Sequence, residues 1–509
     1  MATSKQPTRV RFAPSPTGLT HLGSARTALY NFLLAKQTGG KFFLRIEDTD
    51  QKRYDPNAEQ DLISSLKWLG LAWDEGPDVG GPHGPYYQSK RKDIYRKHAE
   101  ELIEKGKAFY CFCTTEELKV VREGQQKRHE QPHYSGKCRI IPVDEAKQRA
   151  KNGESHVVRF KAPKDGSITV ADKLRGAITV ENSQIDDMVL LKSDGHAVYH
   201  LAAMVDDHLM EISHVLRSEE WLPSLPLHAH IYEAFGWQQP IWVHLSVFLK
   251  PSGKGKMSKR ETEQMRLTGQ SIFVKDFADL GYLPEGVVNW IALMGWSFDD
   301  HTEFFTMADL VEKFDIESLN PSPAAIDFKK LDHFNGLHIR ALPQKELAKR
   351  LVPYFKKAGF EVDAGQLMPI IPIIQTRVTT LDEGPELAGF FFKEEIAPPV
   401  EMLVGKDMSA EQSARAVRKG VEILEVLPEF SAANAEAPMR AVAEEFGLKA
   451  GQFFGILRNA VTGQEISPPL FESMEIVGRD TVLARLKRGL DELEKISKNP
   501  EPPQTTLKK

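Results

Sequence analysis

Apolar and polar positions at the start of the chain predict a strand, a helix and a second strand. Val10 and Phe12 stand two residues apart, as on one face of a buried strand, and prolines then exclude an immediate helix. Apolar residues recur at helical spacing from Ser24 until a pair of glycines at residues 39–40, which is typical of a helix end. A second apolar run covers residues 42–46. Such a strand-helix-strand unit binds ligands beyond the carboxyl ends of its parallel strands.

The junction between the first strand and the helix has the composition of a nucleotide pocket. It reads His21-Leu22-Gly23-Ser24. Gly23 allows a nucleotide to approach the backbone, Ser24 can cap the helix, and the helix N-terminus favours anionic phosphates. The imidazole of His21 would lie at the mouth of this pocket. Because a lone His before Gly is more often a plain turn residue, this interpretation needs support from elsewhere in the chain.

Along the rest of the chain, the spacing of apolar residues predicts a region with strands and helices, followed by a region with helices alone. Residues 189–191, a Ser-Asp-Gly turn and residues 198–201 predict a β-hairpin. The Asp-Asp-His sequence at residues 206–208 has ligand-type side chains, but at this spacing we expect a hydrogen-bonded structural cluster rather than a metal site. From Arg340 onward apolar residues repeat at helical spacing, and we interpret these repeats as core seams rather than cofactor sites.

Composition is typical of a soluble protein with several domains. The 509 residues can bury more than one core, and 41% hydrophobic with 27% charged residues is ordinary for this class. No apolar run reaches about eighteen residues and the first residues lack a signal-peptide core, so we expect a cytoplasmic protein without a membrane partner. The net charge of −5 argues against nucleic acid, but residues 250–259 hold four lysines, and this local charge keeps a nucleic-acid partner open.

The three cysteines indicate a possible zinc site. Cys111 and Cys113 are followed at a distance by Cys138, and without a secretory signal this spacing does not predict a disulfide framework. Two close thiolates and a distant one suit tetrahedral zinc but leave the fourth ligand open, with His133 and His129 nearby. The alternative is three buried thiols without a metal.

A second motif supports the interpretation of the His21 junction as a nucleotide site. Lys256-Met257-Ser258-Lys259-Arg260 follows it in the order seen in class I aminoacyl-tRNA synthetases, whose His-Ile-Gly-His and Lys-Met-Ser-Lys-Ser signatures the two motifs resemble. The Pro-Ser-Pro-Thr-Gly sequence at residues 14–18 and Arg-Ile-Glu-Asp-Thr-Asp at residues 45–50 resemble the glutamyl-tRNA synthetase branch. Ser24 and Arg260 depart from the class consensus, and both are familiar variations within this branch.

The resemblance covers most of the chain and implies its fold class. That fold is α/β, with a Rossmann-type class I catalytic domain, an inserted acceptor-end-binding domain, and an all-helical stem-contact and anticodon-binding half. The expected boundaries are residues 1–90 and 199–260 for the split catalytic domain, 91–198 for the insertion with its candidate zinc site, 261–335 for the stem-contact domain, 336–498 for the anticodon-binding domain and 499–509 for a disordered tail.

The resemblance also implies the reaction. It is the ATP-dependent and Mg²⁺-dependent attachment of L-glutamate to tRNA(Glu) through a glutamyl-adenylate, with release of AMP and pyrophosphate. The implied catalytic residues are His21, Lys256 and Lys259. The implied ATP contacts come from the two signature motifs: His21, Gly23, Ser24, Lys256, Ser258 and Lys259.

Glutamate has two carboxylates and one ammonium group, so its pocket needs two cations and one anion. Guanidinium groups suit carboxylates because they form two parallel hydrogen bonds. By resemblance, Arg217 faces the side-chain carboxylate with help from Tyr199, and Glu47 takes the ammonium. The full implied pocket is Arg11, Ala13, Ser15, Glu47, Tyr199 and Arg217. Ala203 stands where some relatives place an Asn, so one polar contact is expected to be missing or water-mediated.

For the zinc site, the resemblance ranks the candidates for the fourth ligand. Zinc-containing members use a His two residues after the last Cys, where this chain has Ile140. Relatives with a Tyr at the spacing of Tyr134 exist, so the first candidate set is Cys111, Cys113, Tyr134 and Cys138, with His133 and His129 next.

Two residues bear on the choice of tRNA. Gln375 falls where discriminating relatives carry an Arg that reads the third anticodon base. An Arg only donates and suits C, whereas a Gln amide both donates and accepts and could tolerate G, so we hypothesise that tRNA(Gln) is also charged with glutamate. If the alignment to these relatives is shifted by two residues, Arg377 contacts the third anticodon base and the enzyme charges only tRNA(Glu). We expect a monomer.

Three other functions compete with this interpretation. The first is a glutaminyl-tRNA synthetase, but the resemblance implies a β-barrel anticodon-binding domain in that family, whereas the C-terminal half of this chain has a helical pattern. A catalytically silent tRNA-binding paralogue would not need the ATP motifs. A generic nucleotidyltransferase would not need the helical half and should exchange pyrophosphate into ATP without tRNA.

Overall fold

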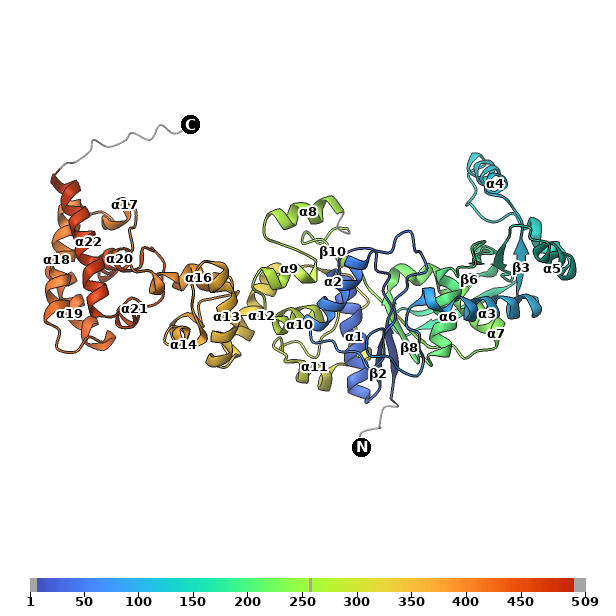
Figure 1. Cartoon of the computed structure of the whole chain (residues 1–509), viewed down its shortest axis with the longest axis horizontal. Coiled ribbons are helices and arrows are strands. Elements are labelled where there is room, and N and C mark those ends of the chain that lie inside the picture. Colours follow the sequence, from blue (N-terminus) through green and yellow to red (C-terminus); the bar gives the residue numbers. More distant parts are fainter. Residues whose placement is uncertain (1–6, 256–258, 499–509) are drawn as a thin grey trace. The chain divides into compact units, whose positions relative to one another are not determined.

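The computed structural model describes residues 7–255 and 259–498, which form two compact units. The first unit covers the described residues up to Ala278 together with Val287–Leu331. The second covers Asp279–Gly286 together with the described residues from Asp332 onward. Within the described residues every strand belongs to the first unit, and the second unit is helical (Figure 1). The expected tail at residues 499–509 lies outside the described residues.

The predicted strand-helix-strand unit is confirmed. β1 (Arg9–Phe12) and β2 (Lys41–Leu44) are parallel neighbours, with α1 (Leu22–Thr38) between them in the chain. The helix ends at Gly39, whose φ of 65° lies in the left-handed region that favours glycine. Its start differs from our expectation, because His21 is the capping residue and Ser24 already lies inside the first turn.

A mixed sheet forms another part of the first unit. β8 (His214–Ser218) and β9 (Ile241–Leu245) are parallel, and α7 (Leu225–Phe235) connects them. The hairpin of β5 (Ser167–Asp172) and β6 (Gly176–Glu181) extends this sheet in the order β6-β5-β9-β8. Strands β5 and β6 thus join this sheet, although they come from residues expected in the insertion.

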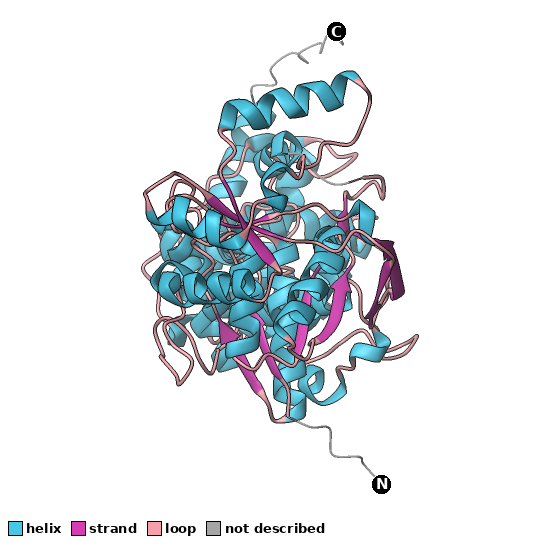
Figure 2. Cartoon of the chain, turned by 90° about the vertical axis from the view of Figure 1, so that its right-hand side faces the viewer, coloured by secondary structure: helices cyan, strands magenta, loops and turns pink. Residues whose placement is uncertain are grey.

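β8 also lies beside β1. The backbone N–H of Ser213 donates to the carbonyl of Arg9 at 2.9 Å, directly before β8 begins. This contact brings the carboxyl ends of β1 and β8 to one edge, where a ligand of a parallel sheet is expected. The strands of the first unit lie among helices, as Figure 2 shows in magenta and cyan.

A second, antiparallel sheet contains Cys111 as the last residue of one strand. It consists of β3 (Ala108–Cys111), β4 (Val157–Phe160) and β7 (Val189–Leu191). The predicted hairpin is confirmed around its turn, where Leu191 pairs with Ala197 and the backbone N–H of Val198 donates to the carbonyl of Leu190 at 2.9 Å. Its second strand ends there, because α6 (Tyr199–Leu209) begins at the next residue. The side chains of α6 from Leu201 to Val205 are fully buried, so this apolar run packs as a helix in the core and not as a strand.

The other elements before the helical unit are short. In chain order they are α2 (Pro56–Trp68), α3 (Lys92–Glu104), α4 (Thr115–Lys127), α5 (Val143–Lys151), β10 (Phe248–Leu249), α8 (Lys259–Leu267), α9 (Val274–Asp279), α10 (Pro284–Leu293), α11 (Met307–Lys313) and β11 (Ala324–Ala325).

The second unit has two apolar cores. The first is enclosed by α12 (Phe328–Ala341), α13 (Gln344–Lys357), α14 (Ala364–Leu367), α15 (Ile371–Ile374) and α16 (Glu383–Ala388). The second is enclosed by α17 (Val400–Leu403), α18 (Ala410–Val426), α19 (Ala432–Glu445), α20 (Ala450–Thr462), α21 (Leu470–Val477) and α22 (Arg479–Lys498). The predicted helical seams are confirmed, since Leu347, Leu351 and Phe355 are fully buried. Among the described helices, none combines the length and apolar character that crossing a membrane requires.

Candidate active site

A cavity of about 820 Å³ lies at the edge where β1 and β8 end. It is lined by residues from every part of the predicted site that the structure describes: Arg11, Ala13, Ser15, His21, Gly23, Ser24, Glu47, Tyr199 and Arg217. Lys256 and Ser258 lie outside the described residues, and Lys259 is the first residue of α8. The cavity therefore unites two groups of residues that are up to two hundred positions apart in sequence.

His21 caps α1 with one ring nitrogen and keeps the other for a ligand. Its Nδ1 accepts from the backbone N–H groups of Gly23 at 3.1 Å and Ser24 at 3.4 Å. An accepting Nδ1 places the ring proton on Nε2, which lies 3.3 Å from Ser24 Oγ. A Cβ at Gly23 would lie 3.1 Å from the ring, so the glycine leaves room for the capping imidazole. Desolvation by the surrounding protein lowers the pKa of His21.

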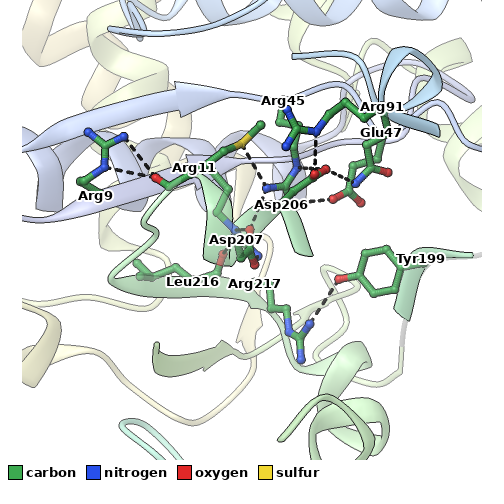
Figure 3. Close-up of polar contacts among 12 residues, drawn as sticks. Arg9, Arg11, Arg45, Glu47, Arg91, Tyr199, Asp206, Asp207, Leu216 and Arg217 are labelled. Atoms are coloured by element: carbon green, nitrogen blue, oxygen red, sulfur yellow. Dashed lines mark hydrogen bonds and ion pairs between the residues drawn. The ribbon is translucent and has the colours of Figure 1, made fainter. Parts of the chain in front are cut away.

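Arg11 in the cavity wall and the fully buried Arg45 share one carboxylate (Figure 3). Arg11 donates to Asp207 from Nε at 3.0 Å and from Nη2 at 3.2 Å, and Arg45 Nη1 donates to the same carboxylate at 2.7 Å. Arg45 Nη2 also donates to Glu47 at 2.9 Å. Burial alone would raise the pKa of Asp207, but the two guanidinium groups outweigh it and lower that pKa. Burial raises the pKa of Glu47, with Arg45 acting against it.

The neighbouring Asp206 belongs to the same network. Its carboxylate accepts from Arg91 Nε at 2.7 Å and from the Tyr95 hydroxyl at 2.7 Å. His208 points elsewhere and stacks on Trp237, with ring centroids 3.9 Å apart. The expected hydrogen-bonded cluster at residues 206–208 is confirmed for the two aspartates, which neutralise buried arginines.

We expect Asp207→Asn to lower the free energy of unfolding by about 3 kcal/mol at pH 7, because Arg11 and Arg45 would then be buried without their shared counter-charge. The pKa of Asp207 is lower in the folded state, so this stabilisation is present above the pKa of the unfolded chain, about 3.9. It is lost as the pH falls from there through the folded-state pKa. Urea unfolding at several pH values measures both effects.

The control for this prediction is Glu123→Gln. Glu123 pairs at 3.9 Å with Lys119 on the surface of α4, and both side chains are more than half exposed. Such a pair contributes about 0.5 kcal/mol or less. Equal effects of the two substitutions, or a loss from Asp207→Asn that is unchanged at pH 3, would contradict the argument.

Arg217 has a different environment from Arg11 and Arg45. Its Nη1 donates to the Tyr199 hydroxyl at 3.2 Å (Figure 3), its Nε donates to His244 Nε2 at 3.0 Å, and its Nη2 lies 3.1 Å from His228 Nδ1. Sequence reasoning found Arg217 and Tyr199 but missed both histidines. They come from α7 and β9, and no local spacing in the sequence marks them as partners of Arg217.

The three cysteines meet Tyr134 at a second site. The three sulfur atoms lie within 4.8 Å of one another, and Cys113 Sγ is 3.6 Å from Cys138 Sγ. The Tyr134 hydroxyl lies 3.4 Å from Cys111 Sγ and 3.6 Å from Cys113 Sγ. Tetrahedral zinc with bonds of about 2.0–2.3 Å sets its ligand atoms about 3.3–3.8 Å apart, so these four groups fit the ion.

The two histidine candidates do not join this cluster. His133 Nδ1 lies 3.0 Å from the carbonyl of Gln131 and 3.3 Å from Gln125 Nε2. His129 is exposed in a turn. Within the described residues, the cysteine trio is also the single group of three or more His, Cys, Asp or Glu side chains arranged for a metal.

Comparison with known families agrees with this geometry. Residues 7–333 match the family described as tRNA synthetases class I (E and Q), catalytic domain. The chain belongs to this family of class I tRNA synthetases. Residues 346–490 of the synthetase match a second family, described as anticodon binding domain, which covers most of α13 to α22.

Named relatives narrow the family to its glutamate branch. The synthetase is 44% identical over 490 residues to the glutamate–tRNA ligase of Dehalococcoides mccartyi, covering 95% of this chain and 97% of the relative. It is 40% identical over 512 residues to that of Chloroflexus aurantiacus, covering 98% and 100%. These matches confirm the resemblance to glutamyl-tRNA synthetases and do not favour the glutaminyl alternative.

A solved structure extends the likeness to three dimensions. The glutamate–tRNA ligase of Elizabethkingia meningosepticum, crystallised in complex with its amino acid, has a TM-score of 0.88 and 34% identity to the synthetase. The match covers 96% of this chain and 100% of that one. The predicted fold class, a class I catalytic domain followed by a helical anticodon-binding part, is therefore confirmed.

Proposed function

We propose that the protein attaches L-glutamate to tRNA(Glu) in two steps, through a glutamyl-adenylate, with release of AMP and pyrophosphate. The observation that carries this proposal is that one cavity is lined both by His21, at the N-terminus of α1, and by the buried Arg217 of β8. The helix end suits phosphates, and the guanidinium suits a carboxylate. The glutamate–tRNA ligase relatives support the same reaction.

In the proposed complex, Arg217 and Tyr199 bind the side-chain carboxylate of glutamate. Glu47 takes the ammonium group, whose positive charge favours the anionic carboxylate, and Arg45 donates to one oxygen of that carboxylate. Ser15 donates through Oγ to the carbonyl of Glu47 at 2.9 Å and so holds that residue in place. Arg11 and Ala13 complete the wall of the pocket.

Activation is an attack of the α-carboxylate oxygen of glutamate on the α-phosphorus of ATP. One P–O bond forms, the bond to the pyrophosphate leaving group breaks, and no proton has to move. The residues therefore act by orienting the reactants and stabilising charge. His21 donates from Nε2 to the phosphates, and by resemblance Lys256 and Lys259 neutralise the pyrophosphate. Mg²⁺ accompanies ATP as the counter-ion of its phosphate oxygens.

We expect His21→Asn to separate the two roles of the imidazole. Asn retains an acceptor at the position of Nδ1 and caps helices well, but it has no donor at the position of Nε2. The rate of activation should fall about 100-fold, while the free energy of unfolding changes by less than about 0.5 kcal/mol. Single-turnover kinetics and urea unfolding measure the two quantities. His21→Ala, which removes the cap as well, should also lose stability. An unchanged activation rate in His21→Asn contradicts the assignment.

The proposed zinc ligands are Cys111, Cys113, Cys138 and the Tyr134 hydroxyl. The support is the match of their spacings to tetrahedral coordination. Bound there, zinc would act structurally, by fixing the end of β3 against the segment around Cys138.

Charging of tRNA(Gln) with glutamate remains part of the proposal through Gln375. Its side-chain N–H groups donate to the carbonyls of Ile339 at 2.9 Å and Leu342 at 2.8 Å, near the end of α12. Gln375 is thus a buried residue and not part of an exposed helix surface. Because the amide nitrogen of Gln375 already donates within the protein, the amide oxygen is the atom left to contact a base. This oxygen can accept from an amino group, and both C and G carry one. Arg377 is exposed and offers only donors.

The decisive experiment is ATP–pyrophosphate exchange with glutamate, run without tRNA, with tRNA(Glu) and with tRNA(Gln). Exchange with tRNA(Glu) alone supports a strict synthetase and removes the Gln375 hypothesis. Exchange with both supports dual specificity. The resemblance to the glutamyl branch implies that activation needs bound tRNA, so exchange that needs no tRNA would instead favour a nucleotidyltransferase. The monomeric state and the cytoplasmic location stay predictions from the sequence.

A further inference from the structure

Arg217 is a buried cation whose neighbours in the structure are uncharged. Its side chain is 5% exposed, and its hydrogen-bond partners are the Tyr199 hydroxyl and the imidazoles of His228 and His244. None of the ion pairs found in the described part of the chain includes it. A buried charge without a counter-charge is costly unless something compensates it.

Three other buried arginines near the cavity have carboxylate partners. Arg11 and Arg45 both pair with Asp207, and Arg45 also pairs with Glu47. Arg91 pairs with Asp206 at 2.7 Å. The fold therefore supplies carboxylates to three buried arginines near Arg217 and gives Arg217 neutral side-chain acceptors instead. Arg26, which also lines the cavity, donates to the backbone carbonyls of Met294 and Ser246.

The hydrogen bonds determine which tautomers these histidines adopt. An arginine can only donate, so the imidazole nitrogens that face it must accept. His244 Nδ1 lies 2.7 Å from Asp172 Oδ2, which places the proton on Nδ1 and leaves Nε2 free to accept from Arg217. His228 accepts on Nδ1, and its Nε2–H can donate to His200 Nδ1 at 3.0 Å.

Burial favours the neutral, accepting forms of His228 and His244. His228 and His244 are fully buried, and desolvation, reinforced by the charge of Arg217, lowers the pKa of each. Asp172 acts against this effect at His244, yet the net pKa of His244 is still lowered. Asp172 itself also accepts from the backbone N–H groups of His244, Leu174 and Arg175, so its negative charge is stabilised locally.

We infer that His228 and His244 are positioning residues that orient Arg217 and keep its charge unneutralised, so that the side-chain carboxylate of the amino-acid substrate becomes its counter-charge. This inference rests on the proposed function. It explains selectivity against glutamine, whose amide has the same shape but would leave the guanidinium without a counter-charge. A carboxylate in place of either histidine would neutralise Arg217 internally and remove that preference.

The test compares three substitutions at His228 by steady-state charging of tRNA(Glu). His228→Leu removes the acceptor at similar size, His228→Asn restores an acceptor at the position of Nδ1, and His228→Asp adds a carboxylate. Loss of one hydrogen bond to a charged group corresponds to about a tenfold change. We expect His228→Leu to raise the KM for glutamate at least about tenfold, with kcat and the KM for ATP within about threefold, and His228→Asn to restore most of the loss.

His228→Asp gives the sharper result. We expect it to raise the KM for glutamate and to lower the ratio of kcat/KM for glutamate over glutamine by at least about tenfold. The matched control is His230→Asn on the same helix, since His230 contacts Asn182 and Glu233 and not Arg217. It should leave the glutamate KM and the glutamate-to-glutamine ratio unchanged.

The outcomes separate this inference from the proposed function. If the wild-type protein does not charge tRNA(Glu) with glutamate, the proposed function fails. If it does, but His228→Asp leaves both the glutamate KM and the substrate ratio within about twofold, the inference alone is overturned. The inference is also overturned if His228→Leu changes kcat and the KM for ATP as much as the KM for glutamate, and if His228→Asn does not restore the KM for glutamate. Should the Leu variant not fold, the Asn and Asp variants decide.

Discussion

Arg217→Gln is expected to lower kcat/KM for glutamate about 1,000-fold or more while leaving the KM for ATP within about threefold. Gln retains hydrogen-bond donors but has no charge, so the substrate carboxylate would enter a buried site without a counter-charge. The partners Tyr199, His228 and His244 would remain, and they donate or accept only as neutral groups. Charging of tRNA(Glu) at varied glutamate and ATP concentrations measures both constants.

Arg9→Gln is the matched control for this prediction. Arg9 lies at the opposite end of β1 from the cavity and pairs with Glu75 at 3.5 Å. Its loss should leave kcat/KM for glutamate within about threefold. A similar loss in both variants would mean that the effect of Arg217 is structural. A loss in Arg217→Gln that is confined to the ATP KM would contradict its assignment to glutamate.

The second large effect is expected at the cysteine cluster. Cys138→Ser should abolish stoichiometric zinc binding and loosen the segment between β3 and residue 141, because structural zinc contributes on the order of 10 kcal/mol to the fold of its site. Metal analysis of the purified protein and limited proteolysis measure the two consequences. Charging of tRNA(Glu) should fall with them, since the resemblance assigns this region to the acceptor end.

Two substitutions test the ligand set itself. His133→Ala should keep the zinc, because His133 contacts Gln125 and Gln131 and not the sulfur atoms. Tyr134→Phe removes the hydroxyl that lies 3.4 Å from Cys111 Sγ and should weaken zinc binding while the three thiolates remain. Wild-type protein that is metal-free yet fully active and protease-resistant would overturn the zinc proposal.

The local features of the catalytic core could be predicted from the chain. The strand-helix-strand unit, the helix end at Gly39 and the helical second half all follow from apolar spacing and glycine placement, which act over a few residues. The same reasoning missed the start of α6, because an apolar run of four residues suits a strand and a helix equally well. Only its packing in the core distinguishes the two.

The family and the set of candidate site residues were also within reach of the sequence. His21, Glu47 and the lysine motif stand in short signatures, and Arg217 and Tyr199 follow by resemblance to a family with the same pocket. The three cysteines predicted a metal cluster, and the resemblance pointed to Tyr134. The structure brings these four groups to tetrahedral spacing and sets His133 apart.

What only the tertiary structure decided is the electrostatic role of each arginine. Arg11, Arg45 and Arg217 are alike in the sequence, yet Asp207 neutralises the first two while imidazoles from α7 and β9 surround the third. Those partners come from elements up to two hundred residues away, and a charge is paired or unpaired according to distances of a few ångströms. Local sequence determines which groups are present, and the packing of distant elements determines which of them are neutralised.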